Sequence, residues 1–376
     1  NNTNNNNKYK YMKLTINTKD LLSAIQNVVG VVEKKQTMPI LGHILFELAD
    51  KKLTLTATDL EVQIKSYSKA NEAESDNASF TVSGRKVYDI IRSLNDESVN
   101  LVLADDKLTI TTKKSSYKLA TLSTQDFPIF DDKKPQESFA INQADLTKVF
   151  IKTQFAMAQQ DVRFYLNGLL LEVGPNKLTA VATDGHRLAK ATTNIEKGSI
   201  EDSAFILPRK AVQELTRTMN EEKDCKLSYS ANQATFNYGD IEFTTKLIDG
   251  KFPDYKRVIP ESTETKIMLD TGILKPALQR VSILANEKFK GVRVEISGNE
   301  LVVSSENPEQ EAAKEIIDLS EEQKSLVLGF NVSYLIDAIS SCDGNLICLG
   351  LNDENSSALI TDPTNPNTEY VVMPMR

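Results

Sequence analysis

The residues best suited to do chemistry lie together in the segment ATDGHRLA, which contains Asp184, His186 and Arg187. A carboxylate near a histidine can support proton transfer, so a hydrolase that uses Asp184 and His186 is one candidate function. Such a hydrolase also needs a nucleophile, and the sequence has no G-x-S-x-G nucleophile elbow. Asp-Gly is common in turns, and the related segment ATDLE at 57–61 has no histidine. The pattern therefore favours a turn histidine over a catalytic one, and we assign no catalytic residue.

Other chemistries lack their usual residue patterns. The sequence has neither a G-x-x-x-x-G-K-[ST] loop nor a G-x-G-x-x-G turn, which argues against nucleotide hydrolysis and dinucleotide chemistry. Its cysteines, Cys225, Cys342 and Cys348, are odd in number and lack metal-ligand spacing. We therefore expect no disulfide framework, no metal and no cofactor, and a cytoplasmic location. Apolar runs extend over only a few residues, so neither a membrane-spanning helix nor a signal peptide is expected.

The start of the sequence differs from the rest in composition. Residues 1–11 read NNTNNNNKYKY and show no apolar periodicity, so we expect them to form a disordered leader. Apolar and polar residues begin to alternate at Met12, in MKLTIN, as is typical of a strand. The first folded domain is therefore expected to begin at residue 12.

The sequence from Met12 onward contains a threefold internal repeat. Segments that begin at Leu41, Leu166 and Phe289 each read as an apolar strand, a short polar turn and an alternating strand. Their glycines, Gly42, Gly168 and Gly291, lie 126 and then 123 residues apart. The first two repeats also close with the same dipeptide, Phe127-Pro128 and Phe252-Pro253. A period of about 120 residues is too long for a solenoid repeat and indicates whole domains in tandem.

Each repeat also contains two amphipathic helical segments. We expect the first helix of each repeat at 20–35, 143–160 and 271–288, and the second at 85–95, 208–219 and 330–341. Asn17 and Asn142 are suited to cap two of them. The predicted fold is α+β, with three similar tandem domains that each hold two helices and two antiparallel sheets. The expected domains are 12–136, 137–264 and 265–376.

Charge is unevenly divided between these helices and the rest of the chain. The net charge is −8, from 44 Lys+Arg and 52 Asp+Glu. The six helical segments and their flanks carry 16 basic and 9 acidic residues, or +7, which leaves −15 for the remainder. If the helices share one surface, that surface would attract phosphate backbones without regard to sequence. Alternatively, Lys and Arg are simply good helix formers on solvated faces.

Seven blocks of the sequence together resemble the bacterial DNA polymerase III beta subunit family, the sliding clamps. They are QDVRFYLNG (160–168), ATDGHRLA (182–189), DGKFPDYKRVIP (249–260), NEKFKGVR (286–293), ENPEQE (306–311), GFNVSY (329–334) and YVVMPMR (370–376). The resemblance covers residues 12–376. It implies a non-catalytic homodimeric ring of six like domains around double-stranded DNA, with helices lining the hole. It also implies that the replicative polymerase alpha subunit, the clamp loader delta subunit and other proteins with clamp-binding motifs are partners in replication and repair.

The resemblance implies a peptide-binding pocket between the second and third domains. Its deep part would consist of Leu166, Thr183, Gly185, His186, Arg187, Leu188, Pro253, Arg257 and Val258. Its shallower part would consist of Tyr165, Asn331, Tyr334, Ser357, Val371, Met373, Pro374, Met375 and Arg376. Two positions depart from the family pattern. Gln159 stands where a histidine is frequent, and family members commonly carry an apolar residue after the final arginine.

The expected DNA contacts come from two sources. The resemblance points to Lys35, Gln160, Arg163 and Phe164, and the charge count adds Arg85, Lys148, Lys152, Arg209, Lys210, Arg217 and Lys275. For the dimer, the resemblance places Tyr117 and Leu119 of one chain against Ile283 and Leu284 of the other. The functional alternatives are the hydrolase described above and a scaffold without a role on DNA.

Overall fold

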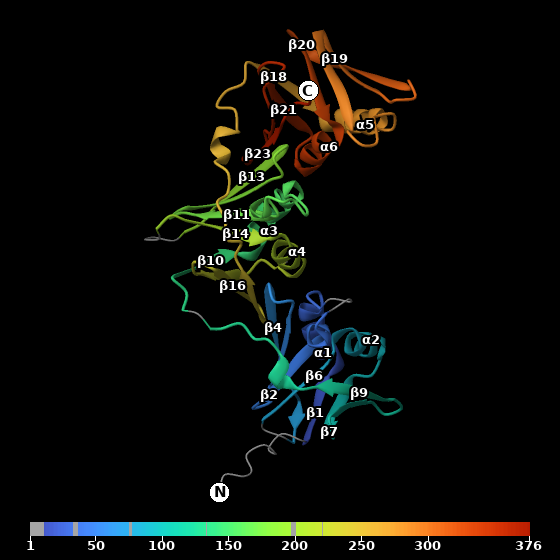
Figure 1. Ribbon diagram of the computed structural model, residues 1–376, viewed down its shortest axis with the longest axis vertical. Coiled ribbons are helices and arrows are strands. Elements are labelled where there is room, and N and C mark those ends of the chain that lie inside the picture. Colours follow the sequence, from blue (N-terminus) through green and yellow to red (C-terminus); the bar gives the residue numbers. More distant parts are fainter. Residues whose placement is uncertain (1–10, 33–36, 75–76, 133, 197–200, 220) are drawn as a thin grey trace. The chain divides into compact units, whose positions relative to one another are not determined.

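A computed structural model describes residues 11–32, 37–74, 77–132, 134–196, 201–219 and 221–376 (Figure 1). The chain forms two compact units: unit 1 is residues 1–144 and 217–247, and unit 2 is residues 145–216 and 248–376. Residues 1–10 of the expected leader lie outside the described residues, whereas Tyr11 pairs with Ala104 and begins the first strand. The leader prediction was therefore wrong for Tyr11.

Unit 1 contains a 13-stranded sheet whose neighbouring strands are antiparallel (Figure 1). The order is β10-β15-β16-β17-β4-β3-β2-β6-β9-β8-β7-β1-β5. The strands are β1 (Tyr11–Asn17), β2 (His43–Ala49), β3 (Lys52–Thr58), β4 (Val62–Lys69), β5 (Glu72–Ala73), β6 (Asn77–Ser83), β7 (Ser98–Ala104), β8 (Lys107–Thr111), β9 (Ser116–Leu122), β10 (Glu137–Asn142), β15 (Asp224–Tyr229), β16 (Gln233–Tyr238) and β17 (Ile241–Lys246). The pairing of β4 with β17 joins strands of the first and second predicted domains into one sheet.

The core of unit 1 follows from the alternation seen in the sequence. Met12, Leu14 and Ile16 of β1 are buried, as period-two patterning requires. Helix α1 (Thr18–Val29) packs near β4 and near α2 (Gly84–Ser93). The Asn17 side chain accepts hydrogen bonds from two backbone N–H groups at the start of α1, which confirms this residue as a cap. Short 3₁₀ turns occupy Pro39–Gly42 and Thr124–Asp126.

Unit 2 contains an eight-stranded sheet and a separate pair of long strands. The order in the larger sheet is β14-β11-β12-β13-β23-β22-β21-β18, and β19 pairs with β20. The strands are β11 (Gly168–Val173), β12 (Lys177–Thr183), β13 (Arg187–Asn194), β14 (Ser203–Pro208), β18 (Thr265–Asp270), β19 (Gly291–Glu306), β20 (Ala312–Asn331), β21 (Leu346–Leu351), β22 (Ala358–Asp362) and β23 (Asn365–Val372). The antiparallel pairing of β13 with β23 joins the second and third predicted domains.

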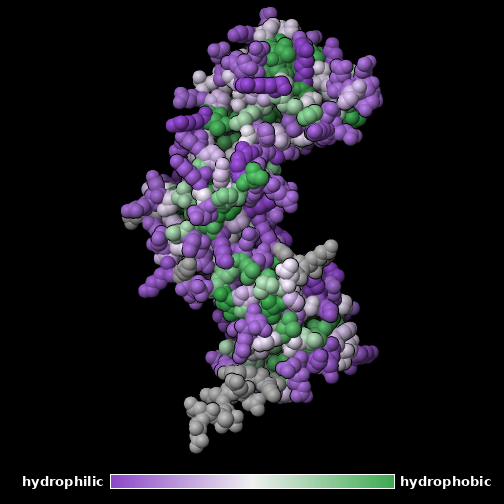
Figure 2. Space-filling model, viewed as in Figure 1, coloured by the Kyte–Doolittle hydropathy of each residue, from purple (hydrophilic) through white to green (hydrophobic). Residues whose placement is uncertain are grey.

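Helices α5 (Thr271–Ser282) and α6 (Val332–Ser341) lie in unit 2 beside β19 and β20. The chain passes between the units at three places: within α3 (Gln143–Ile151), within α4 (Arg209–Thr218) and after Leu247. Further 3₁₀ turns are Gln154–Ala156, Phe164–Leu166 and Tyr255–Arg257. On the face seen in Figure 2, hydrophilic residues predominate and hydrophobic residues form limited patches. Among the residues that the structure describes, no helix is long and apolar enough to cross a membrane.

All six predicted helices are present, but α1, α3 and α5 end six to nine residues earlier than predicted. Helix α1 ends at Val29, although Gly30 after it keeps right-handed helical angles, with φ −62° and ψ −25°. Helix α3 ends at Ile151 because the Thr153 hydroxyl donates to the Val149 carbonyl and the chain turns there. Helix α5 ends at Ser282, where the side-chain hydroxyl donates to the Gln279 carbonyl at 2.6 Å.

The repeated glycines provide a test of packing in the sheet of unit 2. A Cβ atom added at Gly168 would lie 2.5 Å from the carbonyl oxygen of Leu207, whereas one added at Gly42 would meet no atom within 4 Å. We expect Gly168→Ala to lower the free energy of unfolding by about 1–3 kcal/mol and to lower the melting temperature. Gly42→Ala, its matched control, should leave calorimetric melting nearly unchanged. Equal melting of the two variants would contradict this account of the close approach.

Candidate partner-binding site

The ATDGHRLA segment forms a tight turn between β12 and β13. The Thr183 hydroxyl donates to the carbonyl of Arg187 at 2.7 Å and accepts from the amide of Gly185 at 3.1 Å. Asp184 Oδ1 accepts from the amides of His186 and Arg187 at 2.9 and 3.0 Å. Gly185 has a φ of +88°, a conformation that glycine adopts without strain. The interpretation of His186 as a turn residue is consistent with this geometry.

The same contacts argue against the hydrolase alternative. Both oxygens of Asp184 are engaged, since Oδ2 accepts from Arg187 Nε at 3.0 Å. The His186 ring stacks on Tyr334, with centroids 6.4 Å apart and planes 20° apart. A general base needs its orienting carboxylate on the ring nitrogen, and here that carboxylate holds the backbone of the turn instead. Burial, as the largest cause, raises the pKa of the Tyr334 hydroxyl.

Arg187 connects the turn to the third predicted domain. Its Nη1 pairs with Asp337 of α6 at 3.0 Å, and its Nη2 donates to the carbonyl of Phe155 at 3.0 Å. The guanidinium lies 4.5 Å from the centre of the Tyr334 ring. With Asp184 on Nε, the planar group is therefore bonded on all three nitrogens while only 13% of its side chain is exposed. Asp337 and Phe155 were missed by the sequence analysis, because only the fold brings them to Arg187.

The carboxyl-terminal tail continues along this turn. Within the β13–β23 pair, Leu188 faces Val371. Beyond β23 the Met373 amide donates to the His186 carbonyl at 3.0 Å, and the Met375 amide donates to the Gly329 carbonyl at 2.7 Å. The predicted pocket residues on the turn and on the tail are thus brought together by backbone hydrogen bonds.

An apolar cluster lies beside the turn and the tail. Its buried members include Leu170, Leu188, Ile206, Tyr255 and Val371. Half-buried side chains packed against it are Tyr165, Ile248, Phe252, Val258, Ile259 and Leu359. Half-buried apolar groups around a buried floor are suited to accept apolar side chains of a peptide. Of these six, Tyr165 and Val258 were predicted as pocket residues and the other four were not.

The other predicted pocket residues differ in exposure. Leu166 is buried, Asn331, Ser357 and Pro374 are half-buried, and Pro253, Arg257 and Arg376 are exposed. The Tyr255 hydroxyl forms a short hydrogen bond with Glu172, and burial together with this bond raises the pKa of Tyr255. This bond holds the segment that carries Pro253 and Val258 against β11.

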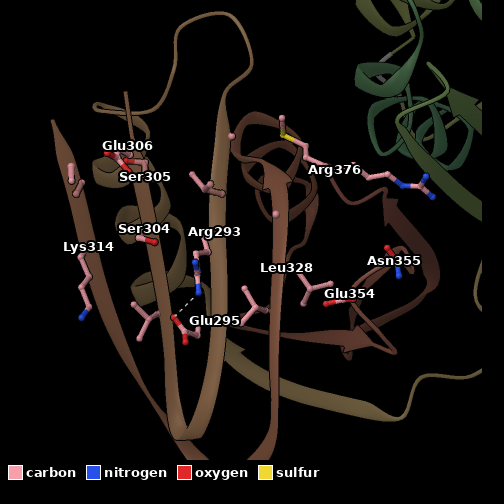
Figure 3. A pocket seen from close by; sticks show the side chains of 18 residues that line it. Arg293, Glu295, Ser304, Ser305, Glu306, Lys314, Leu328, Glu354, Asn355 and Arg376 are labelled. Carbon is pink, nitrogen blue, oxygen red and sulfur yellow. Dashed lines mark ion pairs between the residues drawn. The ribbon is translucent and has the colours of Figure 1, made fainter. Parts of the chain in front are cut away.

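A second hollow, of about 990 Å³, is lined by β19 and β20 and bordered by Met375 and Arg376 (Figure 3). Arg293 and Glu295 form an ion pair of 3.7 Å on its wall, drawn as a dashed line. Figure 3 shows Glu354 and Asn355 at another part of its rim. The tail therefore separates this open hollow from the apolar cluster.

Arg163 is bound within its own turn and reaches the Asp184 loop. It donates to Asp161 Oδ1 and Oδ2 at 3.0 and 2.9 Å, and to the Asp184 carbonyl at 3.3 Å. The side-chain hydrogen bonds from Arg163 lower the pKa of the Asp161 carboxyl to about 2. Gln160 has a φ of +54°, and Phe164 beside Arg163 is 55% exposed. Arg163 thus contacts the turn at the pocket in addition to being a predicted DNA contact.

The predicted DNA-contacting lysines have contrasting environments. Lys152 is 7% exposed, and its ammonium pairs with Asp343 at 2.6 Å and also bonds to the Ser341 carbonyl. This buried and paired ammonium argues against the predicted contact of Lys152 with DNA. By contrast Lys148 is exposed, and Lys210 and Lys275 are half-buried. Lys35 lies outside the described residues.

The predicted DNA-contacting arginines partly bond to backbone carbonyls. Arg85 donates to Val32 at 3.2 Å, Arg209 to Met157 at 3.3 Å, and Arg217 to Gln26 at 3.2 Å. Of the three, Arg217 is exposed and the other two are half-buried. These bonds orient the guanidinium groups near helix surfaces.

The predicted dimer residues lie at element edges. Tyr117 and Leu119 are half-buried on β9, and Ile283, just after α5, is 75% exposed while Leu284 is half-buried.

The network around Arg187 yields a stability prediction. Arg187→Ala removes a nearly buried cation from two carboxylates, so we expect the free energy of unfolding to fall by about 2–4 kcal/mol. Arg257→Ala is the matched control, since Arg257 is 86% exposed in its pair with Asp254 and should change stability by less than about 0.5 kcal/mol. Chemical denaturation of both variants measures the difference. A small loss in Arg187→Ala would show that the network contributes little to stability.

Comparison with known proteins places this fold and site in a family. The sequence matches the DNA polymerase III beta subunit models for the N-terminal domain at 12–131, the central domain at 140–254 and the C-terminal domain at 256–376. The beta sliding clamp of Salmonella typhimurium is 40% identical over 367 residues, which cover 97% of this chain and all of the relative. The crystal structure of the Pseudomonas aeruginosa DNA polymerase III subunit beta has a TM-score of 0.94 at 38% identity, covering 97% of this chain and all of that one. A second Pseudomonas aeruginosa structure, a sliding clamp bound to griselimycin, has a TM-score of 0.93 at 39% identity, covering 97% of this chain and 99% of that one. The chain therefore belongs to the DNA polymerase III beta subunit family, the sliding clamps.

Proposed function

We propose that two copies of this chain close head to tail into a ring that encircles duplex DNA and tethers the replicative polymerase. The observation that carries the proposal is that two strand segments of one chain have a hydrogen-bonded neighbour on one side only. Among the described strands, the Ser116–Ala120 part of β9 pairs only with β8, and residues 312–318 of β20 pair only with β19. An edge that lacks one partner strand can add a strand from another chain.

The charges at these two edges are complementary. Lys113, Lys114 and Lys118 lie in or beside β9, whereas Glu309, Glu311 and Asp318 lie in or beside β20. Pairing β9 of one chain with β20 of the other would bring basic residues to acidic ones at both seams of a two-fold dimer. The exposed Ile283 and half-buried Leu284 would cover Tyr117 and Leu119 there. Such a dimer would pair both of these segments at each of its two seams.

DNA would be held weakly and without regard to sequence. Exposed cations such as Lys148 and Arg217 lie on helices, which suits contacts to phosphates rather than to base edges. Weak contacts to phosphates allow the protein to slide, because each contact can break and form again at the next phosphate. We infer that the protein acts by encircling the DNA and does not catalyse a reaction.

The site beside the ATDGHRLA turn would dock the partners. We propose that apolar side chains of the polymerase alpha subunit, the clamp loader delta subunit and other replication and repair proteins insert among Tyr165, Phe252 and Val258. Half-buried apolar walls support this assignment. Two arginines at the rim, Arg257 and Arg376, would favour peptides that also carry a carboxylate.

Retention on circular DNA tests the ring. The protein is loaded by a clamp loader onto nicked circular plasmid, washed in high salt, and the plasmid is then linearised. We expect the protein to stay on circles and to leave linear DNA, because topological linkage resists salt whereas phosphate contacts do not. Leu284→Lys should be monomeric in sedimentation and absent from the circles. Salt-sensitive binding that ignores DNA ends, or a stable Leu284→Lys dimer, would contradict the proposal.

Deletion of Met373–Arg376 tests the docking site. It removes the tail hydrogen bonds to His186 and Gly329 but leaves β23 complete. We expect affinity for a fluorescent clamp-binding peptide of the alpha subunit to fall at least about tenfold in polarisation titrations. Lys324→Ala, at an exposed ion pair with Glu264, is the control and should bind normally. Unchanged affinity after the deletion would remove the tail from the site.

A further inference from the structure

The turn that frames the docking site occurs a second time, in unit 1, between β3 and β4. The four hydrogen bonds are Thr58 Oγ1 to the Val62 carbonyl at 2.8 Å, the Leu60 amide to Thr58 Oγ1 at 3.1 Å, and the Glu61 and Val62 amides to Asp59 Oδ1 at 2.9 and 2.8 Å. The corresponding bonds of the Thr183–Arg187 turn measure 2.7, 3.1, 2.9 and 3.0 Å. The four hydrogen bonds therefore recur in the second turn with lengths that differ by at most 0.2 Å.

The segments around the two turns also correspond. The Lys246 amide, just where β17 ends, donates to the Glu61 carbonyl at 2.8 Å, as the Met373 amide does to the His186 carbonyl. The Phe127-Pro128 segment follows the first repeat as Phe252-Pro253 follows the second. Unit 1 consequently holds a counterpart of the docking site, which we call the junction groove.

The junction groove is a hollow of about 370 Å³ with an apolar wall. Leu60 is 38% exposed and Ile129 is 51% exposed, and Pro128 and Leu247 also line it. The junction groove differs from the docking site at Gln63, which occupies the position of Leu188. The Gln63 side chain is 3% exposed and accepts a hydrogen bond from the Phe130 amide at 2.9 Å. The buried amide side chain thus fixes the segment that carries Ile129.

The charge of the junction groove is opposite to that of the docking site. Glu61 occupies the position of His186, and Asp131 and Asp132 occupy the positions of Lys256 and Arg257. A smaller adjoining hollow of about 180 Å³ shares Gln233 with the groove and is lined by Asp132 and Glu242. Among the described residues that line either hollow, Lys246 is the one cation, and its ammonium lies 5.3 Å from the centre of the Phe130 ring.

We propose that the junction groove binds a short basic segment of a partner protein, with an apolar side chain between lysines or arginines. The apolar side chain would rest against Leu60 and Ile129, and the cations would face Asp131, Asp132 and Glu242. Charge complementarity selects this occupant over the carboxylate-bearing peptides proposed for the docking site. The proposal does not depend on the ring, because the groove lies within unit 1 of one chain.

The test uses the full-length protein and a fluorescein-labelled Lys-Leu-Lys-Phe-Lys peptide in polarisation titrations. We expect saturable binding that an unlabelled alpha-subunit peptide does not displace. The double variant Asp131→Asn, Asp132→Asn should raise the dissociation constant about fivefold or more, since two carboxylates are lost. Ile129→Ala should also weaken binding, and a Glu-Leu-Glu-Phe-Glu peptide should not bind.

The matched control is the double variant Asp105→Asn, Asp106→Asn. These two aspartates are also adjacent, exposed and in unit 1, but they lie in the β7–β8 turn. Equal weakening by both double variants would mean that the peptide only senses the negative charge of the protein, and would overturn the proposal. Displacement by the alpha-subunit peptide, or absence of saturable binding, would overturn it as well. All these variants should be retained on circular DNA normally. Loss of peptide binding can therefore be distinguished from loss of the ring.

Discussion

The constraint on which the structure depends is that strands at the edge of each repeat need partners. An unpaired edge exposes backbone N–H and C=O groups and invites aggregation. In this chain β4 pairs with β17 and β13 pairs with β23, so sheets continue from one predicted domain into the next. The docking site and the junction groove both lie where such pairs end. Backbone pairing thus positions these surfaces, and side chains decide what they bind.

Much of the fold could be predicted because its signals are local. Alternation in MKLTIN, the Asn17 cap and the amphipathic helical segments depend on neighbouring residues, and these features appear as expected. The repeat added long-range information, since similar segments fold alike. Helix ends were less predictable, because α1 and α3 stop at Val29 and Ile151 while the apolar pattern continues beyond them.

The turn of the candidate site could be predicted from the sequence, whereas the hydrogen-bond partners of Arg187 could not. The Asp-Gly pattern identifies a turn by itself, whereas the partners of Arg187 come from sequence positions 155 and 337. Lys152 illustrates the same limit. Helical position alone made it a candidate for phosphate contact, yet the fold buries the lysine side chain and pairs its ammonium with Asp343, which is itself 58% exposed. Charge counts describe composition, and only tertiary contacts determine which charges remain available.

The β13–β23 pair has a consequence for how the chain folds during synthesis. Leu188 on β13 can pair with Val371 only after the ribosome has synthesised a further 183 residues. At translation rates of about 5–20 residues per second, the edge of β13 stays without its final partner for roughly 10–40 s. Non-local pairing of this kind is slow to form and exposes the strand meanwhile. Nascent chains of this protein are therefore expected to need protection of β13 by chaperones until β23 has emerged from the ribosome.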